Sequence, residues 1–263
     1  MANGSFAMST WTIAAFTHRG RVRSANEDAL AVDTHILTGN MDKPLVMTAM
    51  NDSCVLMIAD GMGGHAQGAM ASRAVLDYLV AAIDRLADAA TCAEVVEEAN
   101  QHLFELMHVH QEALGMGSTI VGAVLKGHRL VTFNVGDSRC YLFSAGQLVQ
   151  LSHDDVPEGE NNQFRSRRSH ALSQALGGTS LPVAIEPHIT IDAPLAPGET
   201  LLLCSDGLTD MVADQIISYT LRTTESPLRS ARKLAAEAFN AGARDNISLM
   251  VVRRSDVQNT QIV

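Results

Sequence analysis

Short runs of residues that are apolar almost throughout recur along this chain. A strand with one solvated face alternates apolar and polar side chains, whereas a strand covered on both faces reads as a continuous apolar segment. The chain is therefore predicted to bury its strands between other layers of structure. The predicted strands are residues 11–16, 55–59, 118–125, 130–135, 139–143, 148–151, 200–204 and 247–253.

Helical periodicity is found in two regions. Between Ala69 and Ala113 the apolar residues follow a 3.6-residue period in two successive segments, and the second opens with a capping-box pattern at Thr91–Glu94. A third helix is predicted from the Ser226-Pro227 pair to about Asn240, because proline favours the first helical turn. Strands, a helix pair, a meander and mixed elements together predict an α+β fold with sheet packed on sheet and helices outside.

Composition limits the function classes. Of the 263 residues, 46% are hydrophobic and 18% charged, as in an ordinary globular protein, and the net charge of −10 disfavours nucleic acid or an anionic membrane as partner. No run approaches about 18 apolar residues and no signal-peptide pattern is evident, so a cytoplasmic protein without a membrane helix is expected. The cysteines form no C-x-x-C pair and are predicted to be buried free thiols; they are Cys54, Cys92, Cys140 and Cys204.

Four aspartates stand at the ends of apolar runs. Asp60 follows VLMIA, Asp137 follows LVTFNVG, Asp206 follows TLLLCS and Asp245 precedes NISLMVV. A single aspartate at a strand end is most often a turn-former that bonds its own backbone. Four such aspartates favour a shared cation site over four separate turns. Packed sheets bring strand ends to a common rim, where gathered carboxylates repel one another unless cations neutralise them. Oxygen-only ligation favours hard cations such as Mg²⁺ or Mn²⁺ over zinc.

Two further segments carry candidate site residues. In DGMGGH, which starts at Asp60, the glycines let the backbone and waters approach a metal and let His65 turn back toward it. Near the N-terminus, Arg23, Glu27 and Asp28 form a polar cluster between strand-like segments. A lone histidine or a charged run is more often a surface feature, but an arginine offers a bidentate fork for phosphate. Metals together with such an arginine indicate phosphoryl chemistry.

Six segments resemble the ordered motifs of the type 2C metal-dependent protein phosphatases, the PPM family, in its bacterial branch. They are RGRVRSANEDAL, IADGMGGH, GSTIVGAVL, FNVGDSRCYL, LLLCSDGLTD and RDNISLMVV, and they span about residues 11–253. Each motif alone is a weak signal, whereas six in the family's order are a strong one. The resemblance implies a central antiparallel β-sandwich flanked by pairs of α-helices, with a metal centre at one end.

The resemblance implies a set of metal ligands for Mn²⁺ or Mg²⁺. Asp60 would bridge two cations, and the backbone carbonyl of Gly61 would add a ligand. Asp206 and Asp245 would complete the pair of cation sites. Asp137 matches the family position linked to a third, weaker cation, which it would share with Asp206.

Other implied residues act on water and phosphate. Glu27 and Asp28 would orient metal-bound waters, and Arg23 would grip the phosphate and offset charge on its oxygens. His65 aligns with the proposed general acid, which protonates the leaving alkoxide. A hydroxide bridging the cations would attack phosphorus in line with the Ser or Thr oxygen, without a covalent phosphoenzyme. Asp210 matches a recurring acidic position whose role is supporting or structural.

The implied function is a protein serine/threonine phosphatase that opposes a Ser/Thr protein kinase. It would act on phosphorylated proteins as a cytoplasmic monomer, with no nucleic-acid or membrane partner. One phosphatase domain is predicted over residues 9–255, with flexible ends at 1–8 and 256–263 and a flap-like segment at about 152–178.

The flap-like segment departs from the family pattern. It is compact, Asp155 stands where many members have histidine, and His170 stands near a position often filled by asparagine. Its basic residues Arg165, Arg167 and Arg168 would suit a phosphorylated acidic surface, although a solvated loop is an equal alternative. These departures concern the choice of substrate rather than the metal chemistry.

Other interpretations rank below a phosphatase. A catalytically silent relative that binds a partner or senses a ligand would lose the aspartates, and all four are present with Arg23. A phosphatase dedicated to one regulatory switch usually carries sensory or membrane segments, which the sequence does not reveal. A simple cation binder would need an EF-hand loop, and a cysteine-based phosphatase a C-x5-R loop; the sequence has neither.

Overall fold

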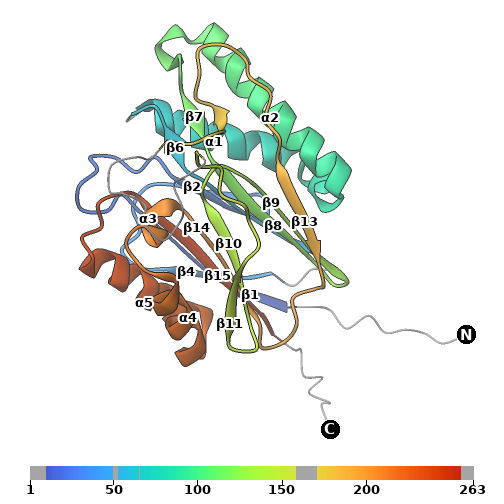
Figure 1. Ribbon diagram of the computed structural model, residues 1–263, viewed down its shortest axis with the longest axis vertical. Helices are drawn as coiled ribbons and strands as arrows, with labels where there is room; N and C mark the ends of the chain where they lie inside the picture. The colour runs from blue at the N-terminus through green and yellow to red at the C-terminus, as the bar shows by residue number, and fades with distance from the viewer. Residues whose placement is uncertain (1–9, 50–52, 65, 158–170, 256–263) are drawn as a thin grey trace, which may run out of the picture.

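The computed structural model describes residues 10–49, 53–64, 66–157 and 171–255 (Figure 1). Two antiparallel sheets of six strands each form its centre. The first sheet has the order β11-β10-β14-β15-β1-β4. Its strands are β1 Thr10–His18, β4 Leu45–Ala49, β10 Arg139–Ser144, β11 Gln147–Gln150, β14 Thr200–Cys204 and β15 Ile247–Ser255.

The second sheet has the order β13-β9-β8-β5-β2-β3 and packs against the first. Its strands are β2 Ala29–Val32, β3 His35–Leu37, β5 Ser53–Ala59, β8 Ile120–Lys126, β9 Arg129–Val135 and β13 His188–Asp192. A small third sheet has the order β12-β7-β6. Its strands are β6 Gly61–Met62, β7 Gly117–Ser118 and β12 Leu176–Gly177.

Helices cover the outer faces of both sheets, which gives four layers (Figure 1). On the second sheet lie α1 Ala66–Ala81 and α2 Ala89–Val109, with the short 3₁₀ helices η1 Ile83–Ala87 and η2 Gln111–Ala113 beside them. On the first sheet lie α4 Asp214–Thr223 and α5 Pro227–Asn240. The short α3 Asp206–Thr209 directly follows β14.

The central strands are apolar throughout because both of their faces are buried. In β5, Leu56 and Ile58 point into the core between the two sheets, while Val55 and Met57 pack beneath α1 and α2. The strands β14 and β15 divide their side chains in the same way, between the inter-sheet core and the core beneath α4 and α5. The predicted α+β sandwich with helices outside is therefore confirmed.

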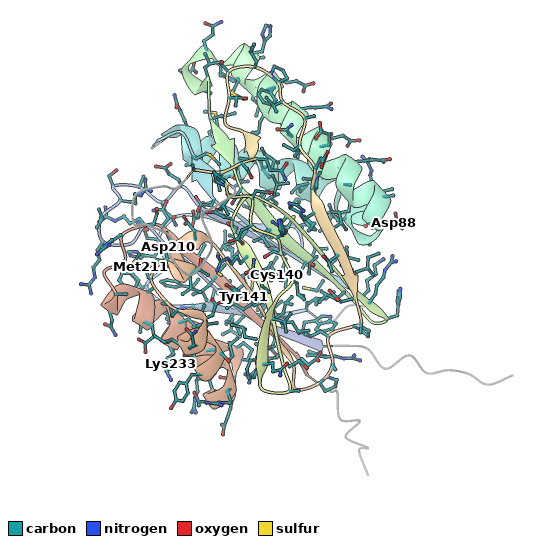
Figure 2. All side chains as sticks on the ribbon, in the orientation of Figure 1. Asp88, Cys140, Tyr141, Asp210, Met211 and Lys233 are labelled. Carbon is teal, nitrogen blue, oxygen red and sulfur yellow. The ribbon has the colours of Figure 1, made fainter. Side chains whose placement is uncertain are left out.

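Two local predictions differ from the structure. The capping box at Thr91–Glu94 is wrong, because α2 already begins after Asp88 and Thr91 lies inside its first turn (Figure 2). The extended Asp88 caps the helix by accepting hydrogen bonds from the N–H groups of Ala90 and Thr91. Helix α4 was not predicted, since only the narrow face with Ile217 and Leu221 is buried and the rest of the segment is polar or exposed.

The four cysteines are buried and free, as predicted. Burial raises the pKa of each thiol, in the cases of Cys92 and Cys204 to about 12. These thiols therefore stay protonated at neutral pH and are poor nucleophiles. Among the described residues, no helix has the length and apolar character needed to cross a membrane.

The predicted domain boundaries stay predictions. The ends at 1–8 and 256–263 lie outside the described residues. Strands of the two large sheets are drawn from nearly the whole described chain, from β1 near its start to β15 at its end.

Replacing Leu56 by alanine tests the inter-sheet core. Leu56 is fully buried, so Leu56→Ala should lower the free energy of unfolding by about 2–5 kcal/mol through lost burial and an unfilled cavity. Val46→Ala is the matched control, because Val46 is 44% exposed and should change stability by less than about 1 kcal/mol. Urea denaturation followed by circular dichroism measures both. Equal losses would contradict the assignment of the core.

Candidate metal centre

A pocket of about 160 Å³ opens where strands of both large sheets end. It brings together residues from distant parts of the sequence, and seven of the residues singled out by sequence analysis line it. The lining residues are Arg23, Glu27, Asp60, Gly61, Met62, Gly63, Gly64, Thr119, Asp137, Leu172, Asp206, Asp245 and Asn246.

The four strand-end aspartates enter this pocket from four different connections. Asp60 stands between β5 and β6, Asp137 between β9 and β10, Asp206 at the start of α3, and Asp245 two residues before β15. The second sheet thus supplies the ends of β5 and β9, and the first sheet the end of β14 and the start of β15. The predicted common rim is present in the structure.

The carboxylates raise one another's pKa values. Burial raises the pKa of Asp60 well above its ordinary value, and the negative charges of Asp28, Asp206, Asp245 and Asp137 raise it further. Burial also raises the pKa of Asp28 to about 7; hydrogen bonds from two serines oppose this shift, while the charges of Asp206 and Asp245 add to it. The site therefore concentrates negative charge that a cation would relieve.

Glu27 is held at the back of the pocket by close packing. Its N–H donates to Asn246 Oδ1 at 2.8 Å, and its carbonyl oxygen accepts from Ser72 Oγ at 2.5 Å. A Cβ atom on Gly68 would lie 2.2 Å from Glu27 Oε2, and one on Gly61 would lie 2.6 Å from the Glu27 carbonyl oxygen. Glycine is required at both positions so that the backbone can approach this closely.

Asn246 is a site residue that sequence analysis missed. Its side-chain amide donates to the carbonyl oxygens of Arg19 and Ala25, at 3.1 and 2.9 Å. Its own N–H donates to Asp245 Oδ1 at 2.8 Å. This one amide therefore fixes the loop before β2 against the last strand of the first sheet. The available signal was its position directly after a strand-end aspartate in RDNISLMVV.

Arg23 stands at the mouth of the pocket with half of its side chain exposed. Its Nη2 lies 2.7 Å from Asp245 Oδ2, and this hydrogen bond is the main cause that raises the pKa of Arg23. A guanidinium carries five N–H donors, so this contact uses only part of its fork. Arg23 is thus both charged and placed beside the carboxylates.

Asp155 holds the turn that carries Asp137. The buried Asp155 accepts a hydrogen bond from the N–H of Gly136 at 2.8 Å. Its other oxygen lies 2.8 Å from His188 Nε2 and accepts from the Gln174 amide at 2.9 Å. The Asp155 carboxylate therefore contacts a histidine from β13 and ties that strand to the turn.

A buried ion pair supports the same region. Arg139, two residues after Asp137, donates to Asp154 through Nε and Nη2 at 2.6–3.0 Å, and both side chains are less than a tenth exposed. Its Nη1 donates to the hydroxyl of Tyr141 at 2.8 Å. The pair joins the start of β10 to the segment that leads to Asp155.

The donor set suits a hard divalent cation. The lining offers carboxylate oxygens and backbone carbonyls without a thiol, and Asp28 Oδ1 is buried with no hydrogen-bond partner among the described residues. In the part of the chain that the structure describes, no group of three or more His, Cys, Asp or Glu side chains is arranged so that it could hold a metal ion. A small cation such as Mg²⁺ does not need such a group, because it keeps several waters and binds through one or two carboxylates.

Comparison with known proteins agrees with this geometry. A family model described as protein phosphatase 2C matches residues 37–240. The serine/threonine phosphatase stp of Listeria welshimeri is 30% identical over 261 residues, covering 92% of this chain and 95% of the relative. The chain belongs to the protein phosphatase 2C family. The predicted membership of a bacterial type 2C serine/threonine phosphatase family is thereby confirmed.

Two further comparisons define the extent of the likeness. The serine/threonine protein phosphatase PstP of Mycobacterium tuberculosis is 32% identical over 251 residues, which are 90% of this chain and 44% of that longer protein. A crystal structure of the catalytic domain of PstP in complex with two manganese ions superposes with a TM-score of 0.74. It is 30% identical and covers 94% of this chain and 100% of its own.

Some predicted residues lie elsewhere or outside the description. His65, His170 and the flap arginines 165, 167 and 168 fall outside the described residues. Asp210 caps α3, donating its N–H to the Asp206 carbonyl at 2.8 Å, and is not among the residues that line the pocket (Figure 2). Asp28 lies behind the lining, where its Oδ2 accepts from Ser205 at 3.1 Å.

Removing one partner of the buried ion pair should be costly. Arg139→Ala leaves the buried Asp154 without its positively charged partner, so the free energy of unfolding should fall by about 3–5 kcal/mol. Arg85→Ala is the matched control, because Arg85 makes a bidentate contact with Glu98 at the exposed surface, where an ion pair adds little to stability. Chemical denaturation of both variants gives the comparison. A loss below about 1 kcal/mol for Arg139→Ala would refute a supporting role for the pair.

Proposed function

We propose that this pocket hydrolyses phosphoserine and phosphothreonine side chains of proteins with the help of two divalent cations, Mn²⁺ or Mg²⁺. The observation that carries the proposal is the gathering of Asp60, Asp137, Asp206 and Asp245 in one pocket, where their negative charges act on one another. A site of such negative charge demands cations, and its oxygen donors match hard ones. The similar catalytic domain of PstP, which was crystallised in complex with two manganese ions, supports the same cofactor.

The ligands are those that the family resemblance implies, and these residues line the pocket. Asp60, Asp206 and Asp245 would hold the two cations together with the carbonyl of Gly61, and Asp137 would share a third, weaker cation with Asp206. The bound cations would act as Lewis acids and lower the pKa of coordinated water toward neutrality.

The chain's own side chains orient the reactants. Glu27 and Asp28 are buried carboxyl groups, and in their ionised forms they would accept hydrogen bonds from waters beside Asp60. Arg23 donates to the phosphate oxygens and offsets the charge that grows on them during in-line attack. Since Arg23 is already held by Asp245, it reaches the phosphate without a large loss of side-chain freedom. His65 stays the predicted donor of the proton to the leaving alkoxide.

The substrate implies a partner reaction. Phosphoserine and phosphothreonine in proteins are made by phosphoryl transfer from a nucleotide, so a Ser/Thr protein kinase must supply them. We therefore infer that the protein opposes such a kinase. Its four buried free thiols suit a reducing cytoplasm, and the monomeric state stays a prediction.

Metal-dependent hydrolysis by the purified protein tests the proposal. Turnover of p-nitrophenyl phosphate and of a phosphoserine peptide should require Mn²⁺ or Mg²⁺ and should stop in EDTA. Asp206→Ala should lower kcat by at least about 100-fold, since it removes a predicted cation ligand. Asp84→Ala is the control, because Asp84 belongs to η1 and is not among the residues that line the pocket.

Two outcomes would contradict the proposal. Turnover that resists EDTA would rule out metal dependence. Folded, metal-loaded protein without turnover would favour the catalytically silent module, which binds a partner or senses a ligand.

Replacing Arg23 separates phosphate binding from metal binding. Arg23→Ala should lower kcat/KM for the phosphoserine peptide by about 100-fold, because a donor to the phosphate oxygens is lost. Arg23→Lys keeps the charge without the fork and should recover only part of the loss. Mn²⁺ affinity, measured by calorimetry, should not fall in either variant. A fall in Mn²⁺ affinity with unchanged kcat/KM would show that Arg23 serves the metal site instead.

A further inference from the structure

A second pocket lies between α5 and the loop that leads into β4. It has a volume of about 300 Å³ and shares no lining residue with the pocket around Asp60, which we call the carboxylate pocket. We call it the α5 groove. Its lining residues are Phe16, Asp42, Lys43, Pro44, Arg232, Ala235, Ala236 and Phe239.

The floor of the α5 groove is apolar and fixed in place. Arg232, Ala235, Ala236 and Phe239 follow the spacing of one helix face, and the two alanines leave room above the helix. The rings of Phe239 and His18 pack in a T-shaped arrangement, with their centroids 5.1 Å apart. A floor of this kind accepts an apolar side chain without rearrangement.

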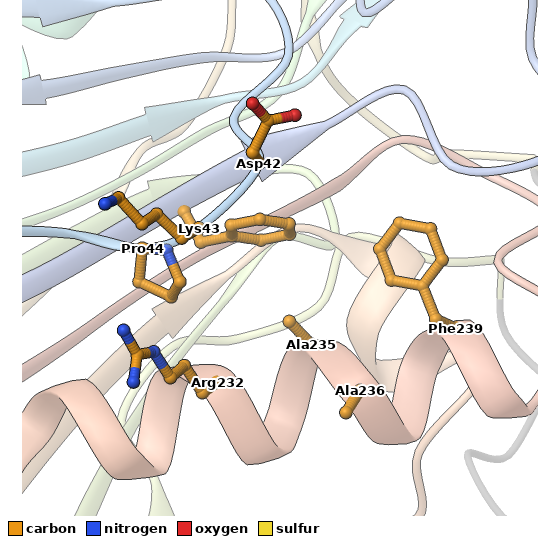
Figure 3. A pocket seen from close by; sticks show the side chains of 8 residues that line it. Asp42, Lys43, Pro44, Arg232, Ala235, Ala236 and Phe239 are labelled. Carbon is orange, nitrogen blue, oxygen red and sulfur yellow. The ribbon is translucent and has the colours of Figure 1, made fainter.

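The rim of the groove is cationic in a protein whose net charge is −10. Figure 3 shows Lys43 and Arg232 on the same side of the groove, with Phe239 opposite. Neither Lys43 nor Arg232 forms an ion pair with a described residue, and Asp42 is the one acidic residue in the lining. The guanidinium of Arg21 adds a third positive charge, 5.8 Å from the centre of the Phe239 ring. These charges complement an acidic ligand.

Two chain segments connect the α5 groove with the carboxylate pocket. Arg21 lies over the groove residue Phe239 and is two residues from Arg23 at the pocket mouth. On the other side, the chain from Phe239 reaches the pocket residue Asp245 in six residues, so the two are at most about 20 Å apart. The segments pack together, since the N–H of Arg21 donates to the carbonyl of Ala243 at 2.7 Å.

We propose that the α5 groove is a docking surface for phosphoprotein substrates. It binds a substrate segment that carries one apolar side chain with neighbouring Asp or Glu residues, about six residues from the phosphorylated Ser or Thr. The apolar side chain sits against Phe16 and Phe239, and the carboxylates face Lys43, Arg232 and Arg21. This inference rests on the proposed function of the carboxylate pocket and adds the class of substrate that the pocket prefers.

The test compares substrates on the purified, Mn²⁺-loaded protein. One phosphoserine peptide carries a Leu flanked by Glu residues about six positions from the phosphoserine, in two versions, before and after it. The reference peptide has Ala and Gln at those positions. We expect kcat/KM to be about tenfold higher for at least one acidic version, with the preference lost at high salt. p-Nitrophenyl phosphate is too small to occupy the carboxylate pocket and the α5 groove at once, so its turnover reports on the carboxylate pocket alone.

Variants locate the preference on the molecule. Lys43→Glu combined with Arg232→Glu should abolish the preference for the acidic peptide and leave p-nitrophenyl phosphate turnover unchanged. Lys126→Glu combined with Arg129→Glu is the control of equal charge change, since these residues lie on the β8–β9 hairpin away from the groove. The control pair should keep the preference.

Other outcomes overturn the proposal. Equal kcat/KM for all peptides, with normal p-nitrophenyl phosphate turnover, would reject the docking surface and leave the phosphatase function intact. Loss of the preference in both double variants would assign it to overall charge. A dimer in sedimentation that the groove variants dissociate would assign the groove to a second copy of this chain. No turnover of any substrate would instead count against the proposed function itself.

Discussion

Repulsion between carboxylates gathered at one end of the β-sandwich is the interaction on which the rest of this structure depends. Burial raises the pKa of Asp60, and the negative charges of four other aspartates raise it further. Such an arrangement costs free energy in the absence of cations, because like charges in a partly desolvated site destabilise one another. The fold must supply that energy elsewhere and must also keep the carboxylates from moving apart.

The β-sandwich supplies the compensating free energy and also holds the carboxylates in place. Its strands are buried on two faces, in one core between the sheets and two beneath the helices, so the ends of the strands have little freedom to separate. Neutral groups then fix the loops: the Asn246 amide bonds two backbone carbonyls, and the close approach of Gly61 and Gly68 to Glu27 closes the back of the pocket. Rigid placement of this kind is what a cation pair and an in-line displacement require.

Sequence alone predicts the layered fold and the gathering of the four strand-end aspartates, because local residue patterns indicate both. Continuous apolar runs report burial on two faces, and an aspartate after such a run reports a position at the rim. The contacts that sequence analysis missed act over long sequence distances. Asp155 lies in a loop and contacts His188 in β13, and Asn246 donates to the carbonyls of Arg19 and Ala25 more than 200 residues away. No local pattern encodes such pairings.

Two predictions about helices were wrong for different reasons. The capping box at Thr91 is a valid local pattern, but Asp88 provides a competing cap earlier in the chain, directly where η1 ends and the chain must turn. Helix α4 was not predicted from the sequence because its position is set by contact with β10 and α5 rather than by a broad apolar face. Tertiary packing therefore decided α4, whereas a competing local cap decided where α2 begins.

The most direct test of this account is the thermal unfolding midpoint of the wild-type protein and of Asp60→Asn, each with and without Mn²⁺. If repulsion around Asp60 dominates the metal-free site, the neutral variant should melt at a higher temperature than the wild type without metal, by about 2–4 °C for each kcal/mol of relieved repulsion. Mn²⁺ should raise the midpoint of the wild type and have much less effect on the variant. A metal-free variant that melts below the wild type, together with an undiminished response to Mn²⁺, would contradict the account.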